Sequence, residues 1–303
     1  MPMPHRALGP FSVSAVGYGA SILSLPEGPQ RTPEEAIATV HAALDAGITL
    51  IDTADVYAPS WDTVGHNERL IAEALGSWSG DASRVVVATK GGLVRTMDGR
   101  WSRNGSYRHL RSAVEASLTN LGRDVIDVYQ WHRPDRWQVF ADVIESFKIL
   151  QMEGLIRAVG LSNVISDEIE IAIELLGPNG LASVQNQFSP TYRCSFPELE
   201  LCRENKVAFL SWSPLGGAAT ARQLASEVPP FATVAERHGV SPARVAVAWA
   251  LAQGEHVIPL VGASRPETIR DSAAGAELEL TEEDLEMLGG HTDQRIPSRS
   301  SAS

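Results

Sequence analysis

Short apolar runs alternate along nearly the whole chain with segments whose apolar residues recur at helical spacing. The runs predict buried strands over residues 16–20, 48–52, 84–89, 125–130, 156–160, 182–186, 207–211 and 256–260. The intervening segments predict helices over residues 33–46, 67–75, 107–121, 139–152, 166–176, 196–204, 266–274 and 281–288, and a longer helical region over 231–253 that is interrupted at Gly239. Because at least one helix follows each strand, the strands are expected to run parallel.

Eight such units predict a closed (β/α)8 TIM barrel that forms a single domain over residues 1–303, and a doubly wound open sheet is the alternative. An N-terminal β-hairpin over residues 6–14 and extra C-terminal helices are expected to complete the fold. Ser166 is the expected N-cap of its helix. Residues 91–106 make a long loop for a βα connection, and the tail of residues 290–303, rich in serine and arginine, is expected to be flexible.

Composition narrows the environment in which the chain acts. A formal charge of −12 argues against broad binding to nucleic acids or anionic membranes. No run approaches the ~18 apolar residues of a membrane span, and the first residues lack the apolar segment of a secretory signal. The two cysteines, Cys194 and Cys202, show no metal-site spacing and are expected to be reduced thiols without an assigned role. We therefore expect a cytoplasmic protein whose partner is a small molecule; its oligomeric state stays open.

Ionisable residues stand where three consecutive predicted strands end. Asp52, Lys90 and His132 close the second, third and fourth strands, and Tyr57 follows five residues after Asp52. Taken singly, the aspartate could cap a helix, the lysine could be solvated and the histidine could belong to the core. In a barrel, however, the carboxyl ends of the strands share one face, where active sites lie. The four side chains are therefore expected around one mouth.

These residue types suit acid–base chemistry. A tyrosine with a pKa of about 10 is a poor proton donor at neutral pH, and a nearby ammonium is expected to lower that pKa. A carboxylate beside the lysine keeps it charged, and a histidine can orient a substrate oxygen. The set predicts reduction of a carbonyl group, in which the tyrosine protonates the developing alkoxide, and it requires no metal.

Several motifs follow the predicted strand ends in order: Gly-Tyr-Gly-Ala at 17–20, Ile-Asp-Thr-Ala-Asp-Val-Tyr at 51–57, Ala-Thr-Lys-Gly at 88–91, Gln-Trp-His at 130–132, Ile-Arg-Ala-Val-Gly-Leu-Ser-Asn at 156–163, Val-Gln-Asn at 184–186 and Trp-Ser-Pro-Leu-Gly-Gly at 212–217. Over residues 7 to 288 the chain resembles the aldo-keto reductase superfamily. The resemblance implies a TIM barrel that binds NADPH without a Rossmann fold. It also implies that Tyr57 is the general acid and that Asp52, Lys90 and His132 complete a catalytic tetrad.

The same resemblance implies a set of cofactor-binding residues, which are Gly19, Ala20, Asp52, Ser162, Asn163, Gln185, Trp212, Ser213, Pro214, Leu215, Gly216, Gly262, Ser264, Arg265, Thr268 and Ser272. The residues at 162, 163 and 185 would hold the nicotinamide carboxamide, and Trp212 would stack on the ring. The loop at 213–216 would wrap the pyrophosphate, and the residues at 19 and 20 would line the floor. Ser264 and Arg265 would meet the adenosine 2′-phosphate, which favours NADPH over NADH.

One position departs from the family pattern. Asp271 and Ser272 stand where relatives carry a Glu-Asn pair that grips the adenine. The serine is shorter and has one donor, so a looser grip is expected there, with Thr268 as possible compensation. Arg270 is either a second phosphate ligand or part of a solvated helix face.

The substrate is left open by the sequence. The long loop carries Arg95, Arg100, Trp101 and Arg103, which would suit a polar or anionic aromatic substrate or else form an exposed lid. The Lys-Gly-Gly-Leu stretch at 90–93 and the His-Arg-Pro-Asp stretch at 132–135 resemble the pyridoxal reductase-like branch of the superfamily. Pyridoxal, a sugar or polyketide ketone, and a broad range of aldehydes are therefore the alternatives. A barrel of this superfamily that serves as a nucleotide-binding, redox-sensing regulatory subunit is the rival function.

Overall fold

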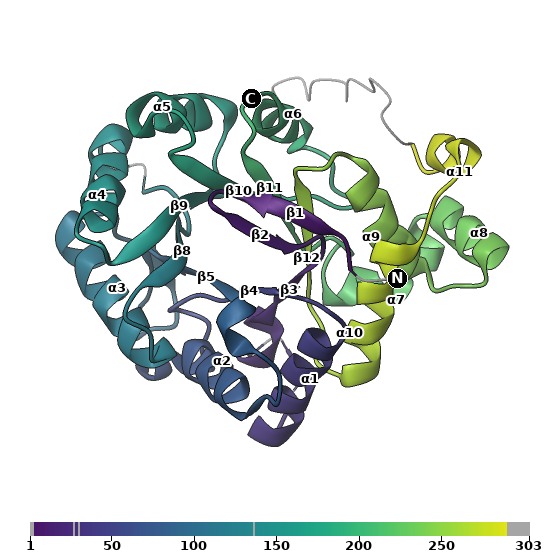
Figure 1. The fold of residues 1–303 in the computed structure, drawn as a ribbon, viewed down its shortest axis with the longest axis horizontal. Coiled ribbons are helices and arrows are strands. Elements are labelled where there is room, and N and C mark those ends of the chain that lie inside the picture. The colour runs from purple at the N-terminus through teal and green to yellow at the C-terminus, as the bar shows by residue number, and fades with distance from the viewer. Residues whose placement is uncertain (1–2, 27, 30, 136, 290–303) are drawn as a thin grey trace.

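The computed structural model describes residues 3–26, 28–29, 31–135 and 137–289, and within them eight parallel strands close into a barrel (Figure 1). The strands follow one another around it in the order β10-β11-β12-β3-β4-β5-β8-β9. The closed barrel confirms the predicted fold, and the alternative of an open sheet is wrong. The barrel strands are β3 (Gly17–Gly19), β4 (Leu50–Asp52), β5 (Val86–Gly91), β8 (Ile126–Trp131), β9 (Ile156–Ser162), β10 (Leu181–Gln187), β11 (Ala208–Trp212) and β12 (Val257–Val261).

Helices surround the barrel, and α7, α8 and α11 gather at one side outside the ring (Figure 1). The apolar stripes of the helices pack on the outward faces of the strands and form the larger of two apolar cores. The helices are α1 (Pro33–Asp45), α2 (His66–Ser77), α3 (Tyr107–Leu121), α4 (Phe140–Met152), α5 (Ser166–Leu176), α6 (Phe196–Glu204), α7 (Ala218–Glu227), α8 (Pro229–His238), α9 (Pro242–Ala252), α10 (Pro266–Ala273) and α11 (Glu282–Met287).

The predicted N-terminal hairpin closes one end of the barrel. It consists of β1 (His5–Leu8) and β2 (Phe11–Ser14), whose Leu8 and Val13 join the smaller core inside the barrel. The turn packs so closely that a Cβ on Gly9 would lie 2.7 Å from the Cβ of Ala182. Because apolar side chains fill this end, a ligand has access to the barrel interior only from the carboxyl ends of the strands.

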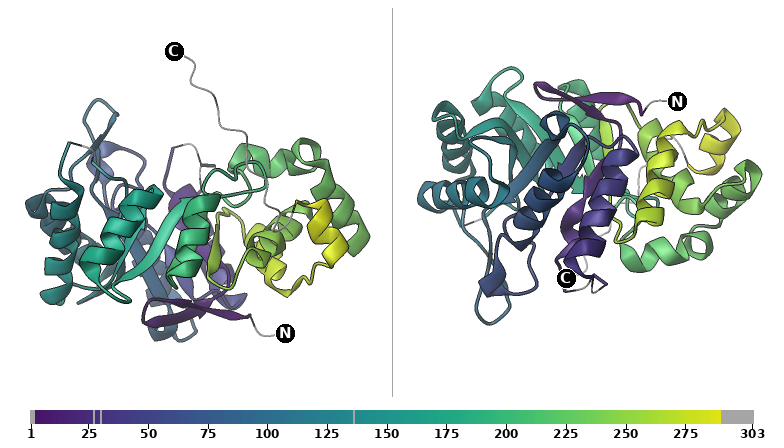
Figure 2. Two further views of the ribbon diagram at one scale, coloured as in Figure 1. Left: turned by 90° about the horizontal axis from the view of Figure 1, so that it is seen from above. Right: turned by 60° about the horizontal axis from the view of Figure 1, so that its bottom comes forward.

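Three local features differ from the expectations. Residues 91–106 contain a second hairpin, β6 (Leu93–Arg95) and β7 (Trp101–Arg103), which projects at the end of the barrel opposite the first hairpin (Figure 2). The helix α7 was not predicted, because its small and polar residues lack a strong apolar stripe. Ser166 is not an N-cap: α5 begins at that residue, and the N–H of Ile165 is bonded instead by the Glu168 carboxylate at 3.0 Å.

Two further expectations concern the environment of the chain. Within the described ranges, the structure contains no helix with the length and apolarity needed to cross a bilayer. Cys194 is exposed, Cys202 is buried, and no disulfide joins them. The tail of residues 290–303 lies outside the described residues, so its expected flexibility stays a prediction.

Two buried tyrosines of the barrel provide a matched test of stability. Both Tyr18 and Tyr129 have no exposed surface. The Tyr18 hydroxyl donates to the carbonyl of Ala263 at 2.7 Å, whereas the Tyr129 hydroxyl has no partner among the described residues. We expect Tyr18→Phe to lower the free energy of unfolding by about 1–3 kcal/mol, because it leaves a buried carbonyl unpaired, and Tyr129→Phe to leave it unchanged or raise it by up to about 1 kcal/mol. Urea unfolding followed by circular dichroism measures both; equal losses would contradict the assignment.

Candidate active site

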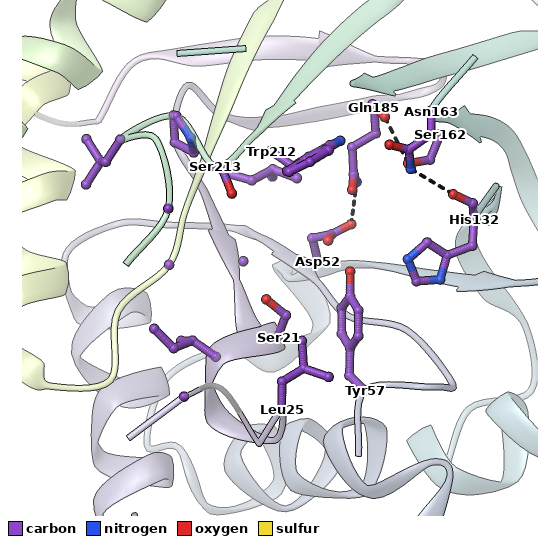
Figure 3. Close-up of a pocket in the computed structure, with 18 of the residues that line it drawn as sticks. Ser21, Leu25, Asp52, Tyr57, His132, Ser162, Asn163, Gln185, Trp212 and Ser213 are labelled. Atoms are coloured by element: carbon purple, nitrogen blue, oxygen red, sulfur yellow. Dashed lines mark hydrogen bonds between the residues drawn. The ribbon is translucent and has the colours of Figure 1, made fainter. Parts of the chain in front are cut away.

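Lys90 lies at the centre of a buried polar cluster where β4 and β5 end (Figure 3 shows Asp52 and Tyr57 beside the pocket). Its side chain has no exposed surface. The ammonium donates to Asp52 Oδ1 at 2.5 Å, to the carbonyl of Thr53 at 2.8 Å and to Tyr57 Oη at 3.1 Å. Three donors thus meet three acceptors, and the alternative of a solvated lysine is wrong.

Asp52 joins strands from across the barrel. Its second oxygen, Oδ2, accepts from Gln185 Nε2 at 2.7 Å and from Gln130 Nε2 at 3.0 Å. The carboxylate therefore binds side chains of β5, β8 and β10 as well as standing at the end of β4. It caps no helix, so that alternative is also wrong.

The pKa shifts of Lys90 and Tyr57 correct one expectation. Burial by itself lowers the pKa of Lys90, but the Asp52 carboxylate and the Tyr57 hydroxyl outweigh it, and the pKa lies above its ordinary value. Burial raises the pKa of Tyr57, the Lys90 ammonium lowers it and Asp52 raises it, with the net result above the ordinary value. The expected influence of the lysine is present, but the predicted net lowering is wrong, because desolvation of the phenolate is the larger effect.

His132 follows β8 and faces Tyr57 across the pocket (Figure 3). The two rings meet edge to face, with centroids 5.5 Å apart and planes at 85°. Burial, together with the charges of Lys90 and Arg133, holds the pKa of His132 well below its ordinary value. The imidazole that lines the pocket is therefore neutral at physiological pH.

Two adjoining cavities extend from these residues. The first, of about 440 Å³, is lined by Asp52, Tyr57 and His132 and reaches to Gly262. The second, of about 630 Å³, lies toward the start of α10. Both share a wall made of Ile22, Gly28, Leu215, Ala221 and Gly262. The arrangement provides an elongated site with the ionisable cluster at one end.

Most of the predicted cofactor residues line this elongated site. The first cavity contains Gly19, Asp52, Ser162, Asn163, Gln185, Trp212, Ser213, Pro214, Leu215 and Gly262, and the second contains Leu215, Gly262, Ser264, Arg265, Thr268 and Ser272. Two predicted residues line neither cavity. Ala20 is fully buried, and its carbonyl accepts from Asn67 at 2.9 Å. Gly216 turns the loop, with a φ of 82° and its N–H donating to the carbonyl of Ser213 at 2.8 Å.

The polar side chains after β9 and β10 hold one another in place (Figure 3). The Ser162 hydroxyl donates to the carbonyl of Gln185 at 2.9 Å. The Asn163 amide donates to the carbonyl of His132 and to Ser162 Oγ, both at 3.0 Å. Asn163 has a φ of 60°, a left-handed conformation that asparagine tolerates better than most residues. These bonds orient the amide groups around the first cavity before any ligand enters.

Asp271 and Ser272, which stand in α10 where contacts to the adenine were expected, differ in their bonding. Asp271 is held by Arg244 at 2.9 Å and by the Ser241 hydroxyl, so its carboxylate is already occupied. The Ser272 hydroxyl is buried beside the second cavity and has no partner among the described residues. Arg265 makes an ion pair with Glu267 at 3.3 Å, and both side chains are more than half exposed.

Several residues that shape the site were not identified from the sequence. The loop after β3 provides Ser21, Ile22, Leu25 and Gly28 to the first cavity, and Arg31 lines the second with a buried Nε that has no partner within the described residues. Gln130 orients Asp52, and Arg133 lines the first cavity. The available signal was the Gln-Trp-His motif at 130–132, which contains Gln130 and is followed directly by Arg133.

Comparisons with known proteins agree with this architecture. A model described as Aldo/keto reductase family matches residues 15–293. A 6-dehydroglucose reductase of Novosphingobium aromaticivorans is 32% identical over 308 residues, which cover 98% of each chain. Pyridoxine 4-dehydrogenase of Escherichia coli is 30% identical over 292 residues, 93% of this chain and 96% of that one. The structure of the glycerol dehydrogenase AKR11B4 from Gluconobacter oxydans superposes with a TM-score of 0.79 at 26% identity and 94% coverage of both chains.

The lowered pKa of His132 predicts how stability depends on pH. Below its ordinary pKa of about 6.5 the unfolded chain binds a proton that the folded protein does not bind. The free energy of unfolding therefore falls on acidification, by up to about 1.4 kcal/mol per pH unit for this residue. His66, His109 and His256 have pKa values lowered by burial and act in the same direction. We expect His132→Gln to show a shallower loss than wild type between pH 7 and 5 in urea unfolding; parallel curves would contradict a neutral His132.

Proposed function

The chain belongs to the aldo/keto reductase family of oxidoreductases, and we propose that it reduces an aldehyde or ketone to an alcohol with NADPH, with Tyr57 as the general acid. The observation that carries the proposal is the contact of Lys90 with both Asp52 and Tyr57 at the wall of the first cavity. This cluster combines a protonated phenol with a fixed positive charge beside it.

The residues of the chain supply the proton side of the reaction. NADPH, when bound, supplies the hydride that adds to the carbonyl carbon. The raised pKa of Tyr57 keeps its phenol protonated at neutral pH, so that it can transfer the proton to the carbonyl oxygen as negative charge develops there. Lys90, 3.1 Å away, stabilises the phenolate that remains, and Asp52 keeps that lysine charged. The neutral His132 orients the carbonyl oxygen toward the phenol.

The polar and aromatic side chains around the two cavities support NADPH as the cofactor. Ser162, Asn163 and Gln185 present amide and hydroxyl groups for the nicotinamide, and Trp212 presents an aromatic side chain to the same cavity. At the other end, the buried Nε of Arg31 and hydroxyl of Ser272 are without partners in the described part of the chain, beside Ser264 and Arg265. Such donors suit phosphate and adenosine groups, and Arg265 supports a preference for NADPH over NADH.

The names of two relatives support a small polar carbonyl compound as substrate. One is a 6-dehydroglucose reductase and the other a pyridoxine 4-dehydrogenase. We propose sugar-derived carbonyl compounds and pyridoxal as the first compounds to test, together with simple aldehydes. The charge of −12 supports a small-molecule partner over nucleic acid or membrane, and the free thiols support a cytoplasmic location.

Tyr57→Phe tests the role of the phenol. We expect kcat with an activated aldehyde such as 4-nitrobenzaldehyde to fall by about 10²–10⁴-fold, because the proton donor is lost. NADPH affinity, measured by fluorescence titration, should change little. Tyr107→Phe is the control, since that hydroxyl bonds Glu153 on the outer helices. Undiminished turnover by the Tyr57 variant would exclude it as the general acid. Tight NADPH binding without turnover in the wild type would instead favour the redox-sensing function.

Arg265→Ala tests the choice of nucleotide. We expect the Kd for NADPH to rise by about 10–100-fold, because a charge-assisted bond to the 2′-phosphate is lost, and the Kd for NADH to change by less than about 3-fold. Arg270→Ala, at an exposed position of α10, should leave both values unchanged. An equal rise for both nucleotides in the Arg265 variant would exclude a role in recognising the phosphate.

A further inference from the structure

Arg133 lines the first cavity, and Arg95 and Arg103 bond to segments next to Tyr57 and His132; we call these three the mouth arginines. The pairing of β6 with β7 sets Leu93 opposite Arg103 and Arg95 opposite Trp101, which places Arg95 and Arg103 on one face of the hairpin. Arg133 directly follows His132 and lines the cavity itself. The three guanidinium groups therefore come from two segments that meet at the carboxyl end of the barrel.

Neutral acceptors hold these side chains in position. Arg95 donates to the carbonyl of Ala58, beside Tyr57, and its guanidinium lies 5.1 Å from the centre of the Trp101 ring. Arg103 donates to the carbonyl of Pro134 at 2.9 Å, and Arg133 donates to Asn163 Oδ1 at 3.1 Å. The cluster thus flanks both Tyr57 and His132, the two groups proposed to contact the carbonyl oxygen.

The mouth arginines have no carboxylate partner within ion-pair distance among the described residues. Arg100, at the tip of the same hairpin, contrasts with them, because it pairs with Asp98 at 2.6 Å and its side chain is 84% exposed. The absence of a partner is notable in a chain with 37 acidic and 25 basic residues. Burial, and to a smaller extent the charge of Arg103, lower the pKa of Arg133, so the two guanidinium groups lie close enough to repel each other.

We propose that the mouth arginines bind an anionic group of the substrate, a carboxylate or a phosphate, and that the substrates are carbonyl compounds that carry such a group. The inference rests on the proposed carbonyl reduction and adds the substrate class. A planar guanidinium matches both kinds of anion, and an arriving anion relieves the repulsion between Arg103 and the partly buried Arg133. The Trp101 ring beside Arg95 adds an apolar surface at the same mouth.

Matched substrate pairs test the class and separate the two anions. With saturating NADPH, kcat/KM is measured for 4-carboxybenzaldehyde against its methyl ester, and for 4-formylphenyl phosphate against 4-methoxybenzaldehyde. We expect the anionic member of at least one pair to be favoured by about 10-fold or more, and the preference to shrink as salt is raised from 50 to 500 mM. A preference in only one pair identifies the anion as carboxylate or phosphate.

Substitutions of the mouth arginines show whether these residues cause the preference for the anion. We expect Arg133→Gln and Arg103→Gln each to lower kcat/KM for the favoured anion by about 10-fold, chiefly through KM, and Arg103→Gln to change kcat/KM for the neutral partner by less than about 3-fold. Arg100→Gln, whose parent side chain already pairs with Asp98, should change neither. Because Arg133 also bonds Asn163, the NADPH affinity of the Arg133 variant is measured in parallel. If Arg133 only positions Asn163, the variant will lower turnover of anionic and neutral substrates alike, and that result would overturn the proposal.

The two proposals fail in different ways. Equal kcat/KM within both pairs, with clear reduction of the neutral aldehydes, would overturn the anion site and leave the reductase standing. No reduction of any aldehyde despite NADPH binding would overturn the proposed function and the substrate class with it. A preference for the anion that both the Arg133 and the Arg103 variant retain would place its recognition elsewhere and overturn the proposal.

Discussion

The structure of the site depends on one buried ammonium. Lys90 has no exposed surface, and a charge so placed is tolerated only with a complete set of partners. Asp52 is the essential partner, and it is itself held by amides from two other strands. The ion pair therefore ties β4, β5, β8 and β10 together at one end of the barrel. Tyr57 receives the third ammonium hydrogen bond, and this fixes its hydroxyl at the cavity wall.

The two ends of the barrel have opposite physical character. Leu8 and Val13 fill the end beneath the N-terminal hairpin with apolar side chains, so that end contributes stability and excludes solvent. The other end contains the ionisable cluster, the two cavities and the projecting β6–β7 hairpin. Desolvation at this end sets the ionisation states, since it keeps the pKa of Tyr57 high and that of His132 low. Both shifts suit a site that donates a proton to an uncharged carbonyl group.

Charge is distributed along the elongated site in three zones. The ion pair of Lys90 and Asp52 is buried and balanced internally. The mouth arginines lie on one side of it, and Arg31 and Arg265, which pair with exposed glutamates, line the second cavity on the other. An acidic chain with a net charge of −12 would repel anions without such local exceptions. Under the proposed function, chemistry at the centre of the site is separated from the recognition of anionic groups around it.

The sequence by itself determined the order of the barrel strands, the closed barrel and the meeting of Asp52, Tyr57, Lys90 and His132, because periodicity is local and parallel strands end on one face. Tertiary structure alone decided the bonds of Gln130 to Asp52, the place of Arg31 and Arg133 on the cavity walls and the net direction of the pKa of Tyr57. Those properties depend on burial and on partners distant in sequence. The β6–β7 hairpin was not predicted from the sequence either, since short strands with polar faces give little local signal.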